Sequence, residues 1–271
     1  MLRKAGSTVT PETSPLFSVV TVCLNAEPHI AEAIDSVLDQ GFDDFEYVAV
    51  DGGSTDGTLE LVRERAATSS RPFRWVSEAD EGLFDAMNKG LALARGQFVV
   101  YVGADDRLLP GALEAVARAS RANQAAGIVC GGARVTGPHG GWDEPASVLV
   151  RRGMPQRAPS RHQSIFVRVA DLRAVGGFDV SYRIAADYDA YLKLVEAGAS
   201  QELILETLSE FRLGGVSSRN ALATAREYRD VRVAHGANPT VERIVMHKSA
   251  MAARLHAGGM RVRASLRGRD V

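Results

Sequence analysis

The stretch "VAVDGGSTDGT", residues 48–58, is the part of the sequence that decides the fold. An apolar run ends in Asp51, and glycines, hydroxyl residues and Asp56 follow before the next apolar segment. A short, continuous apolar run is typical of a strand that is buried on both faces, and the polar residues after it are typical of a turn. The stretch therefore predicts a buried strand whose carboxyl end carries an acidic side chain.

The neighbouring segments alternate between strand and helix patterns. We expect strands at 17–24, 45–50, 73–78 and 97–103, and helices from Pro28, at 58–67, at 83–94 (with Leu83, Met87 and Leu91 in the core) and at 110–126. Strands that alternate with helices of this length predict βαβ units and a parallel sheet covered on both faces. In such sheets ligands bind beyond the carboxyl ends of the strands, which is where Asp51 lies.

After about residue 140, in the second half of the chain, the regular alternation of strands and helices ends. Strands are expected at 164–169 and 202–211, a helix at 188–198, and two more helices beyond Val216. The sequence contains no convincing linker. We therefore predict a flexible leader at 1–15, one α/β domain at 16–220, and a helical, basic extension at 221–271.

Composition narrows the class of protein. The chain has 271 residues, a formal net charge of -1, 45% hydrophobic and 24% charged residues, as in an ordinary soluble globular protein. A net charge near zero argues against nucleic acid as the main partner. Cys23 and Cys130 are predicted to be small core residues of a protein from a reducing compartment.

No apolar run in the sequence reaches the length of a membrane span. The apolar run "LFSVVTVCL" (16–24) lacks a cleavage site, so we expect a strand there and not a signal peptide.

Acidic residues at successive strand ends suggest a nucleotide site of an unusual kind. The first strand ends in "CLNAEPH" (23–29), which has none of the glycines of a dinucleotide fold, and the sequence has no P-loop motif. The acidic residues are Asp51, Asp80, Glu81, Asp105 and Asp106. Carboxylates repel phosphates unless a cation lies between them, and Mg²⁺ or Mn²⁺ bound by one or two carboxylates and substrate phosphates is a common arrangement. The pattern predicts a site for a nucleoside diphosphate and a divalent metal.

Several motifs in a fixed order resemble glycosyltransferase family 2. They are "SVVTVCLNAEPHIAEAIDSVLDQ", "VDGGSTDGT", "DEGLFDAMNKGLALARG", "VYVGADD", "RHQSIFVR", "VGGFDVSYRIAADYDAYLKL" and "FRLGGVSS", which together span about residues 17–220. The resemblance implies the GT-A fold, a Rossmann-like, mainly parallel sheet flanked by helices. It also implies transfer of a sugar with inversion, as in bacterial enzymes that build polysaccharides, lipopolysaccharides and glycolipids. Residues 16–107 would then bind the nucleotide sugar and residues 108–220 the acceptor.

The resemblance also implies roles for individual residues. Donor contacts fall on Asn25, Glu27, Asp51, Asp80, Asp85, Asn88, Lys89, Asp105, Gly214 and Gly215. Asp105 and Asp106 would bind Mn²⁺ or Mg²⁺, although Gly103 stands where the family usually has another aspartate. His162 and Gln163 would contact the donor phosphates or the acceptor. Asp187 would be the catalytic base, with Ala186 where the family often has glutamate, and a helix that starts there should favour its ionised form.

Taken alone, the same residues have simpler interpretations that stay open. The residues from Asp51 to Asp56 could form a turn only, and Asp106 could cap the helix near Pro110. Asp85, Asn88 and Lys89 could lie on a solvated helix face, and His162 could be structural. A non-catalytic relative that acts as a binding or scaffold subunit is the main alternative function. A sugar-phosphate nucleotidyltransferase is less compatible, because it needs a glycine-rich basic loop after the first strand.

Partners and location follow from the resemblance and the charge distribution. The expected donor is a UDP-, GDP- or dTDP-sugar, and the expected acceptor is a saccharide or a lipid-linked saccharide. Residues 241–271 contain seven Lys and Arg and two acidic residues, a net charge of +5 (7 − 2). Its positive charge predicts that this segment is weakly attracted to anionic membranes. The alternative is a solvated helix packed on the domain. The expected location is cytoplasmic, with contact at the inner face of the membrane left open.

Overall fold

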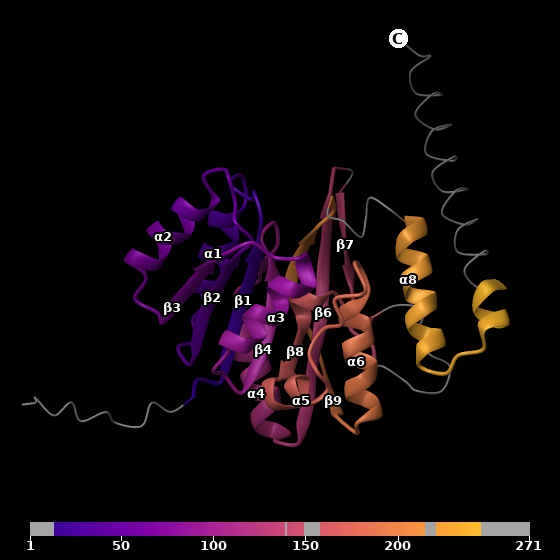
Figure 1. Cartoon of the computed structure of the whole chain (residues 1–271). Coiled ribbons are helices and arrows are strands. Elements are labelled where there is room, and N and C mark those ends of the chain that lie inside the picture. Colours follow the sequence, from indigo (N-terminus) through magenta and orange to yellow (C-terminus); the bar gives the residue numbers. More distant parts are fainter. Residues whose placement is uncertain (1–13, 139, 149–157, 215–220, 245–271) are drawn as a thin grey trace, which may run out of the picture.

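The structure is a computed structural model that describes residues 14–138, 140–148, 158–214 and 221–244 (Figure 1). Residues 1–13 of the predicted leader, Gly215 and residues 245–271 of the basic segment lie outside the described residues. No helix in the described part of the chain is long and apolar enough to cross a membrane.

The first half of the chain forms the parallel part of one sheet. The strand β1 (Phe17–Cys23) lies between β2 (Phe45–Asp51) and β4 (Phe98–Gly103), and β3 (Phe73–Ser77) pairs with β2. All these pairs are parallel, as the sequence predicts. In this register Cys23 pairs with Asp51, and Asp51 pairs with Ser77, so the carboxyl ends of the strands lie at one edge.

The second half extends the same sheet with mixed strand directions. The order is β3-β2-β1-β4-β8-β6-β9-β5. The strand β8 (Ile165–Arg168) is antiparallel to both β4 and β6 (Ala126–Gly137), while β9 (Ser200–Arg212) is parallel to β6. Two short strands, β5 (Arg107–Leu108) and β7 (Gly140–Glu144), pair with β9 and β6. The fold class is therefore α/β with a mostly parallel sheet.

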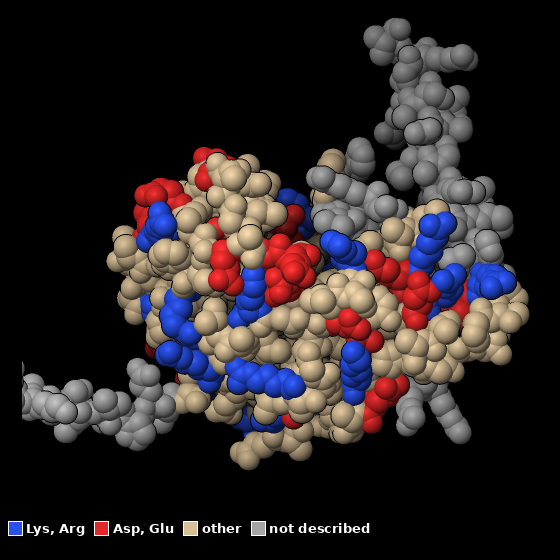
Figure 2. Space-filling model, in the orientation of Figure 1, with Lys and Arg blue, Asp and Glu red and all other residues tan. Residues whose placement is uncertain are grey.

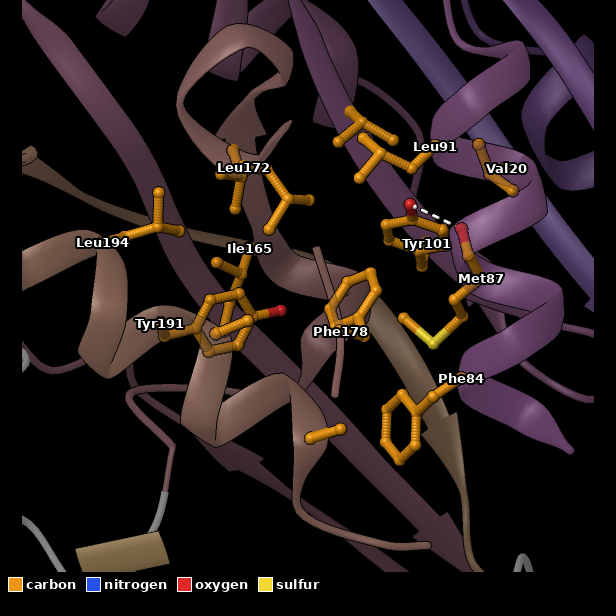
Figure 3. Packing of buried hydrophobic residues seen from close by; sticks show 14 of the residues in the cluster. Val20, Phe84, Met87, Leu91, Tyr101, Ile165, Leu172, Phe178, Tyr191 and Leu194 are labelled. Atoms are coloured by element: carbon orange, nitrogen blue, oxygen red, sulfur yellow. Dashed lines mark hydrogen bonds between the residues drawn. The ribbon is translucent and has the colours of Figure 1, made fainter. Parts of the chain in front are cut away.

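Helices cover both faces of the sheet, because alternate residues of the central strands point to opposite faces. Val19 packs in a cluster with residues of α1 (Ile30–Leu38), α2 (Thr58–Thr68) and α4 (Ala112–Ala122). Val20 packs in the opposite cluster with residues of α3 (Leu83–Leu93), α5 (Val169–Ala174) and α6 (Ala186–Glu196). Figure 3 shows this second cluster, in which the Tyr101 hydroxyl donates to the Met87 carbonyl at 3.0 Å.

Some sequence predictions are wrong at the level of single elements. Leu83 is 45% exposed, and Phe84 takes the core position beside Met87. The helix predicted at 110–126 covers only Ala112–Ala122, and the long strand β6 that follows was not predicted. The glycines of this strand interrupt the apolar pattern by which a strand is predicted. A Cβ on Gly131 would lie 2.5 Å from the Leu208 side chain, so the tight packing against β9 requires glycine at this position.

The C-terminal part begins with α8 (Ala221–Ala234), which lies beside α6 (Figure 1). A second helix begins at residue 239, and its start is tied to α8 by an ion pair of 2.8 Å between Glu242 and Arg232. Acidic and basic side chains are interspersed on the face shown in Figure 2.

Candidate active site

A cavity of about 1320 Å³ opens at the carboxyl ends of β1 and β4. Its wall also includes the first turn of α6, the strand β7, the segment before β8, and α8. The predicted site residues that line it are Asn25, Asp105, Asp106, His162 and Asp187. The structure thus brings together residues from both halves of the chain around one space.

The carboxylates of Asp105 and Asp106 follow β4 but differ in their surroundings. Asp106 is 3% exposed, accepts a hydrogen bond of 2.9 Å from the Arg212 backbone N–H, and also accepts from the Gln163 side-chain amide. Burial, followed by the Asp105 charge, raises the pKa of Asp106 to about 7. Asp105 accepts no hydrogen bond from the described residues and keeps its carboxylate at the cavity. Asp106 does not cap α4, whose N-cap is Gly111.

Asp105 and Asp106 fit a divalent cation that takes most of its ligands from water and from the phosphates of a substrate. The described residues hold no cluster of three or more His, Cys, Asp or Glu side chains that could bind a metal by themselves. A cation held by one carboxylate, waters and substrate phosphates needs no such cluster. Burial is the main cause of the raised pKa of Asp106 and the Asp105 charge the second, and a bound cation would oppose both effects.

Asp187 is the second residue of α6 and points its carboxylate to the cavity. Its Oδ1 accepts from the Tyr188 backbone N–H at 2.7 Å, and its Oδ2 lies 4.0 Å from Nδ1 of His162. The side chain is 13% exposed. Burial raises the pKa of Asp187 to about 6. The backbone N–H groups at the helix start act in the opposite direction, toward the ionised form as expected, but burial outweighs them. The carboxylate is nevertheless ionised above about pH 6.

His162 faces Asp187 as a neutral imidazole. Burial, with the neighbouring Arg161 charge, lowers the pKa of His162 to about 4. A neutral histidine cannot form an ion pair with Asp187, but one of its ring nitrogens can donate a hydrogen bond while the other accepts one. Among the residues that the structure describes, no lysine or arginine forms a salt bridge with the Asp187 carboxylate.

Arg161 is a site residue that sequence reasoning missed, although it lies in the quoted "RHQSIFVR" motif. Its guanidinium donates two hydrogen bonds, 2.9 and 3.1 Å long, to the Glu144 carboxylate, and it lies 4.6 Å from the Phe211 ring centroid. The Arg161 charge opposes the effect of burial on the Asp187 pKa. Trp142, 49% exposed, also lines the cavity and donates to Glu144 at 3.2 Å. Nothing in the local sequence around Glu144 predicted a site.

Asp51 ends β2 as predicted, but its carboxylate lies below the cavity surface. It is 1% exposed and accepts from the Ser54 backbone and hydroxyl and from the Ser77 hydroxyl at 2.6 Å. Cys23, which lines the cavity, places its Sγ 3.9 Å from Oδ1 of Asp51. The contact of Asp51 with a nucleotide therefore stays a prediction.

Asn25 and Glu27 hold the loop between β2 and α2. Oδ1 of Asn25 accepts from the Thr55 backbone N–H at 2.8 Å, and Oε2 of Glu27 accepts from the Gly57 N–H at 3.1 Å. Asn25 adopts a positive φ of 50°, a conformation that asparagine tolerates better than most residues. Of the two, only Asn25 lines the cavity.

The predicted second donor segment reaches the cavity through the apolar residues Leu83, Phe84 and Met87 of α3. The predicted donor residues of this segment do not line the cavity; they are Asp80, Asp85, Asn88 and Lys89. Asn88 donates to the Phe178 carbonyl at 2.8 Å and accepts from its N–H at 2.9 Å, so it joins α3 to the segment before α6. Lys89 contacts the Ala79 carbonyl at 2.7 Å and Asp85 at 3.2 Å. Asp80 accepts from the Gly82 N–H at 3.0 Å. These contacts give each residue a structural role, and donor binding by them stays a prediction.

Gln163 and Gly214 follow His162 and Leu213, which line the cavity, but do not line it themselves. Gln163 is fully buried, and its Oε1 has no hydrogen-bond partner among the described residues. Gly214 has a φ of 138° and follows Leu213, which does line the cavity. Gly215 lies outside the described residues.

Comparison with known proteins identifies the family. A model of glycosyl transferase family 2 matches residues 18–175, more than half of the chain, so the chain belongs to this family and is a glycosyltransferase. A PGL/p-HBAD biosynthesis glycosyltransferase of Mycobacterium tuberculosis is 30% identical over 213 residues, 76% of this chain and 80% of that protein. A chondroitin synthase of Escherichia coli is 30% identical over 189 residues, 68% of this chain but 27% of that protein.

Solved structures show the same GT-A fold. TarS of S. aureus in complex with UDP-GlcNAc has a TM-score of 0.63 and 19% identity, covering 86% of this chain and 71% of the TarS fragment. The mannosyltransferase PcManGT of Pyrobaculum calidifontis, in complex with GDP-Man and Mn²⁺, has a TM-score of 0.65 and 20% identity, covering 94% of this chain and 79% of that one. The resemblance stated from the motifs and the predicted fold class are both confirmed.

Proposed function

We propose that the protein transfers a sugar from a nucleotide-diphosphate sugar to an acceptor hydroxyl, with inversion at the anomeric carbon. The observation that carries the proposal is that Asp105 and Asp187 line one cavity, from the end of β4 and the start of α6. One carboxylate is suited to the charged diphosphate side of the reaction and the other to the acceptor side. The glycan-biosynthesis names of the relatives support a saccharide or glycolipid acceptor.

Asp187 is the base in this scheme. In its ionised form it accepts the proton of the acceptor hydroxyl while that oxygen forms a bond to the anomeric carbon. The bond from the same carbon to the diphosphate oxygen breaks, and its electron pair leaves with the nucleoside diphosphate. A single displacement of this kind converts an α-linked donor into a β-linked product and needs no covalent intermediate on the enzyme.

Asp105 would hold a divalent cation together with the donor diphosphate, with Asp106 behind it. When bound, Mn²⁺ or Mg²⁺ would supply positive charge that stabilises the leaving diphosphate. The complex of PcManGT with GDP-Man and Mn²⁺, a protein of the same fold, supports this assignment. We further propose that residues 16–107 bind the donor and that residues 108–220 bind the acceptor.

The test is a thermal-shift panel of UDP-, GDP- and dTDP-sugars, with and without MnCl₂, followed by release of nucleoside diphosphate. A ligand at a hundredfold excess over Kd stabilises a protein by about 2.7 kcal/mol. For a chain of this size that stabilisation raises Tm by about 2 to 4 °C per kcal/mol. A donor that shifts Tm and releases nucleoside diphosphate supports the proposal, and the absence of any shift across the panel contradicts it.

A binding or scaffold subunit is the second candidate function. Ala186 and Gly103, which stand where the family often has acidic residues, favour it. A subunit of this kind would give the donor-induced Tm shift but neither transfer nor release of nucleoside diphosphate. The same preparation therefore separates the two functions.

A further inference from the structure

The helix α8 holds the peptide segment that leads into α6. Oε2 of Glu227 accepts from three consecutive backbone N–H groups, those of Arg183 and Ala185 at 3.0 Å and Ile184 at 2.7 Å. Its Oε1 lies 3.2 Å from the Arg183 nitrogen. A carboxylate that receives several successive N–H groups is a strong, charge-assisted contact.

This contact supplies what the local sequence of α6 lacks. The N-cap of α6 is Ala185, which has no side-chain oxygen and makes no side-chain capping hydrogen bond. A helix start usually takes such an oxygen from its own N-cap residue. Here the carboxylate comes from Glu227, 42 positions after Ala185 (227 − 185), and its negative charge also suits the positive end of the helix.

Two further contacts fix α8 along the length of α6. The rings of Tyr228 and Tyr188 stack with centroids 5.0 Å apart. The imidazole of His235 lies 2.9 Å from Asp189 and 3.0 Å from Glu196. These contacts hold α8 at both ends of α6, and the two helices lie side by side in Figure 1. The position of Glu227 relative to residues 183–185 is therefore not set by one contact alone.

We infer that Glu227 is a positioning residue for the transfer reaction: it holds residues 183–185 in place and thereby directs the Asp187 carboxylate into the cavity. This inference rests on the proposed role of Asp187 as the base. Ile184 and Arg183 also line the cavity, so the held segment is itself part of the site wall. A displacement of a base by about 1 Å can cost about a hundredfold in rate, because proton transfer depends steeply on geometry.

The test uses the full chain and four variants. Glu227→Ala removes every acceptor for the three N–H groups, while Glu227→Gln keeps one oxygen of similar reach. Asp230→Ala is the matched control, since it removes the same charge from α8 at an exposed residue that pairs with its neighbour Arg229. Asp187→Asn reports on the base itself. For each variant and the parent we measure amide hydrogen exchange, kcat and the Kd of the donor. The donor is the nucleotide sugar that gives the largest Tm shift in the panel.

For Glu227→Ala we expect faster amide exchange at residues 183–185 and a kcat that falls about 10- to 100-fold, with an unchanged donor Kd. Glu227→Gln should recover most of both properties, and Asp230→Ala should match the parent. Parent-level kcat in Glu227→Ala, or a fall in kcat matched by an equal loss of donor affinity, overturns the inference. If Asp187→Asn keeps parent turnover, the proposed base is wrong, whereas the exchange at 183–185 still reports whether Glu227 holds the segment.

Discussion

Asp187 and Asp189 lie two positions apart on α6, and only Asp187 reaches the cavity. Asp189 is 3% exposed and is paired with Lys193 at 2.7 Å and His235 at 2.9 Å. Residues two apart on a helix do not share a face, so one carboxylate can meet substrate while the other binds the neighbouring helix. The same short stretch of sequence thus provides one carboxylate that reaches the cavity and one that is bound within the protein.

Asp187→Asn should lower turnover by about 10² to 10⁴ and leave donor binding unchanged. Asparagine keeps the shape of the side chain but cannot accept the acceptor proton. The measurement is donor-induced Tm shift and turnover on one preparation. Turnover within a few-fold of the parent would show that Asp187 is not the base.

Asp189→Asn should behave in the opposite way. It removes the negative charge between Lys193 and His235, so we expect the free energy of unfolding to fall by about 1 to 3 kcal/mol. Turnover per folded molecule should stay near that of the parent. Urea unfolding of Asp187→Asn and Asp189→Asn side by side checks the contrast, and equal stability of the two variants would contradict it.

The pH dependence of kcat/KM should show an acidic limb near pH 6. Burial raises the pKa of Asp187 to about 6 in the free protein, and only the ionised form can accept a proton. Activity should therefore rise with pH up to about 6 and fall about tenfold per unit below it. A profile flat from pH 5 to 8 would exclude Asp187 as a group that must be ionised.

Asp105→Asn should abolish the effect of manganese without destabilising the protein. Asp105 accepts no hydrogen bond from the described part of the chain, so its replacement leaves no buried donor unsatisfied. The donor-induced Tm shift, measured with and without MnCl₂, should become the same in both conditions. If variant and parent give identical manganese titrations of turnover, Asp105 does not bind the metal.

Asn88→Ala should lower stability while donor affinity stays constant. The side chain makes hydrogen bonds of 2.8 and 2.9 Å to the Phe178 backbone, and their loss should cost about 1 to 3 kcal/mol, or a few degrees in Tm. Glu81→Ala, at an exposed position before the same helix, is the control and should change Tm very little. A loss of donor affinity at unchanged Tm would instead support the donor contact that the family motif implies.

The order of strands and helices in the first half could be predicted from the sequence, because each element carries its own periodic pattern of apolar residues. Strands β1 to β4 and the helices between them follow these patterns, and parallel pairing brings their acidic ends to one edge. The strand β6 could not be predicted in this way. Its Gly131 is required by the side chain of Leu208 in β9, which lies 77 residues later in the chain (208 − 131).

The sequence by itself determined the fold class, the family and the edge of the sheet at which the site lies, since these depend on local patterns and on motifs in a fixed order. Only the tertiary structure decided which carboxylates face the cavity. Asp51 turns inward to Ser54 and Ser77, whereas Asp105 and Asp187 remain at the surface of the cavity. The direction of a side chain is set by the groups that pack around it, and these come from distant segments, as Glu227 does for the start of α6.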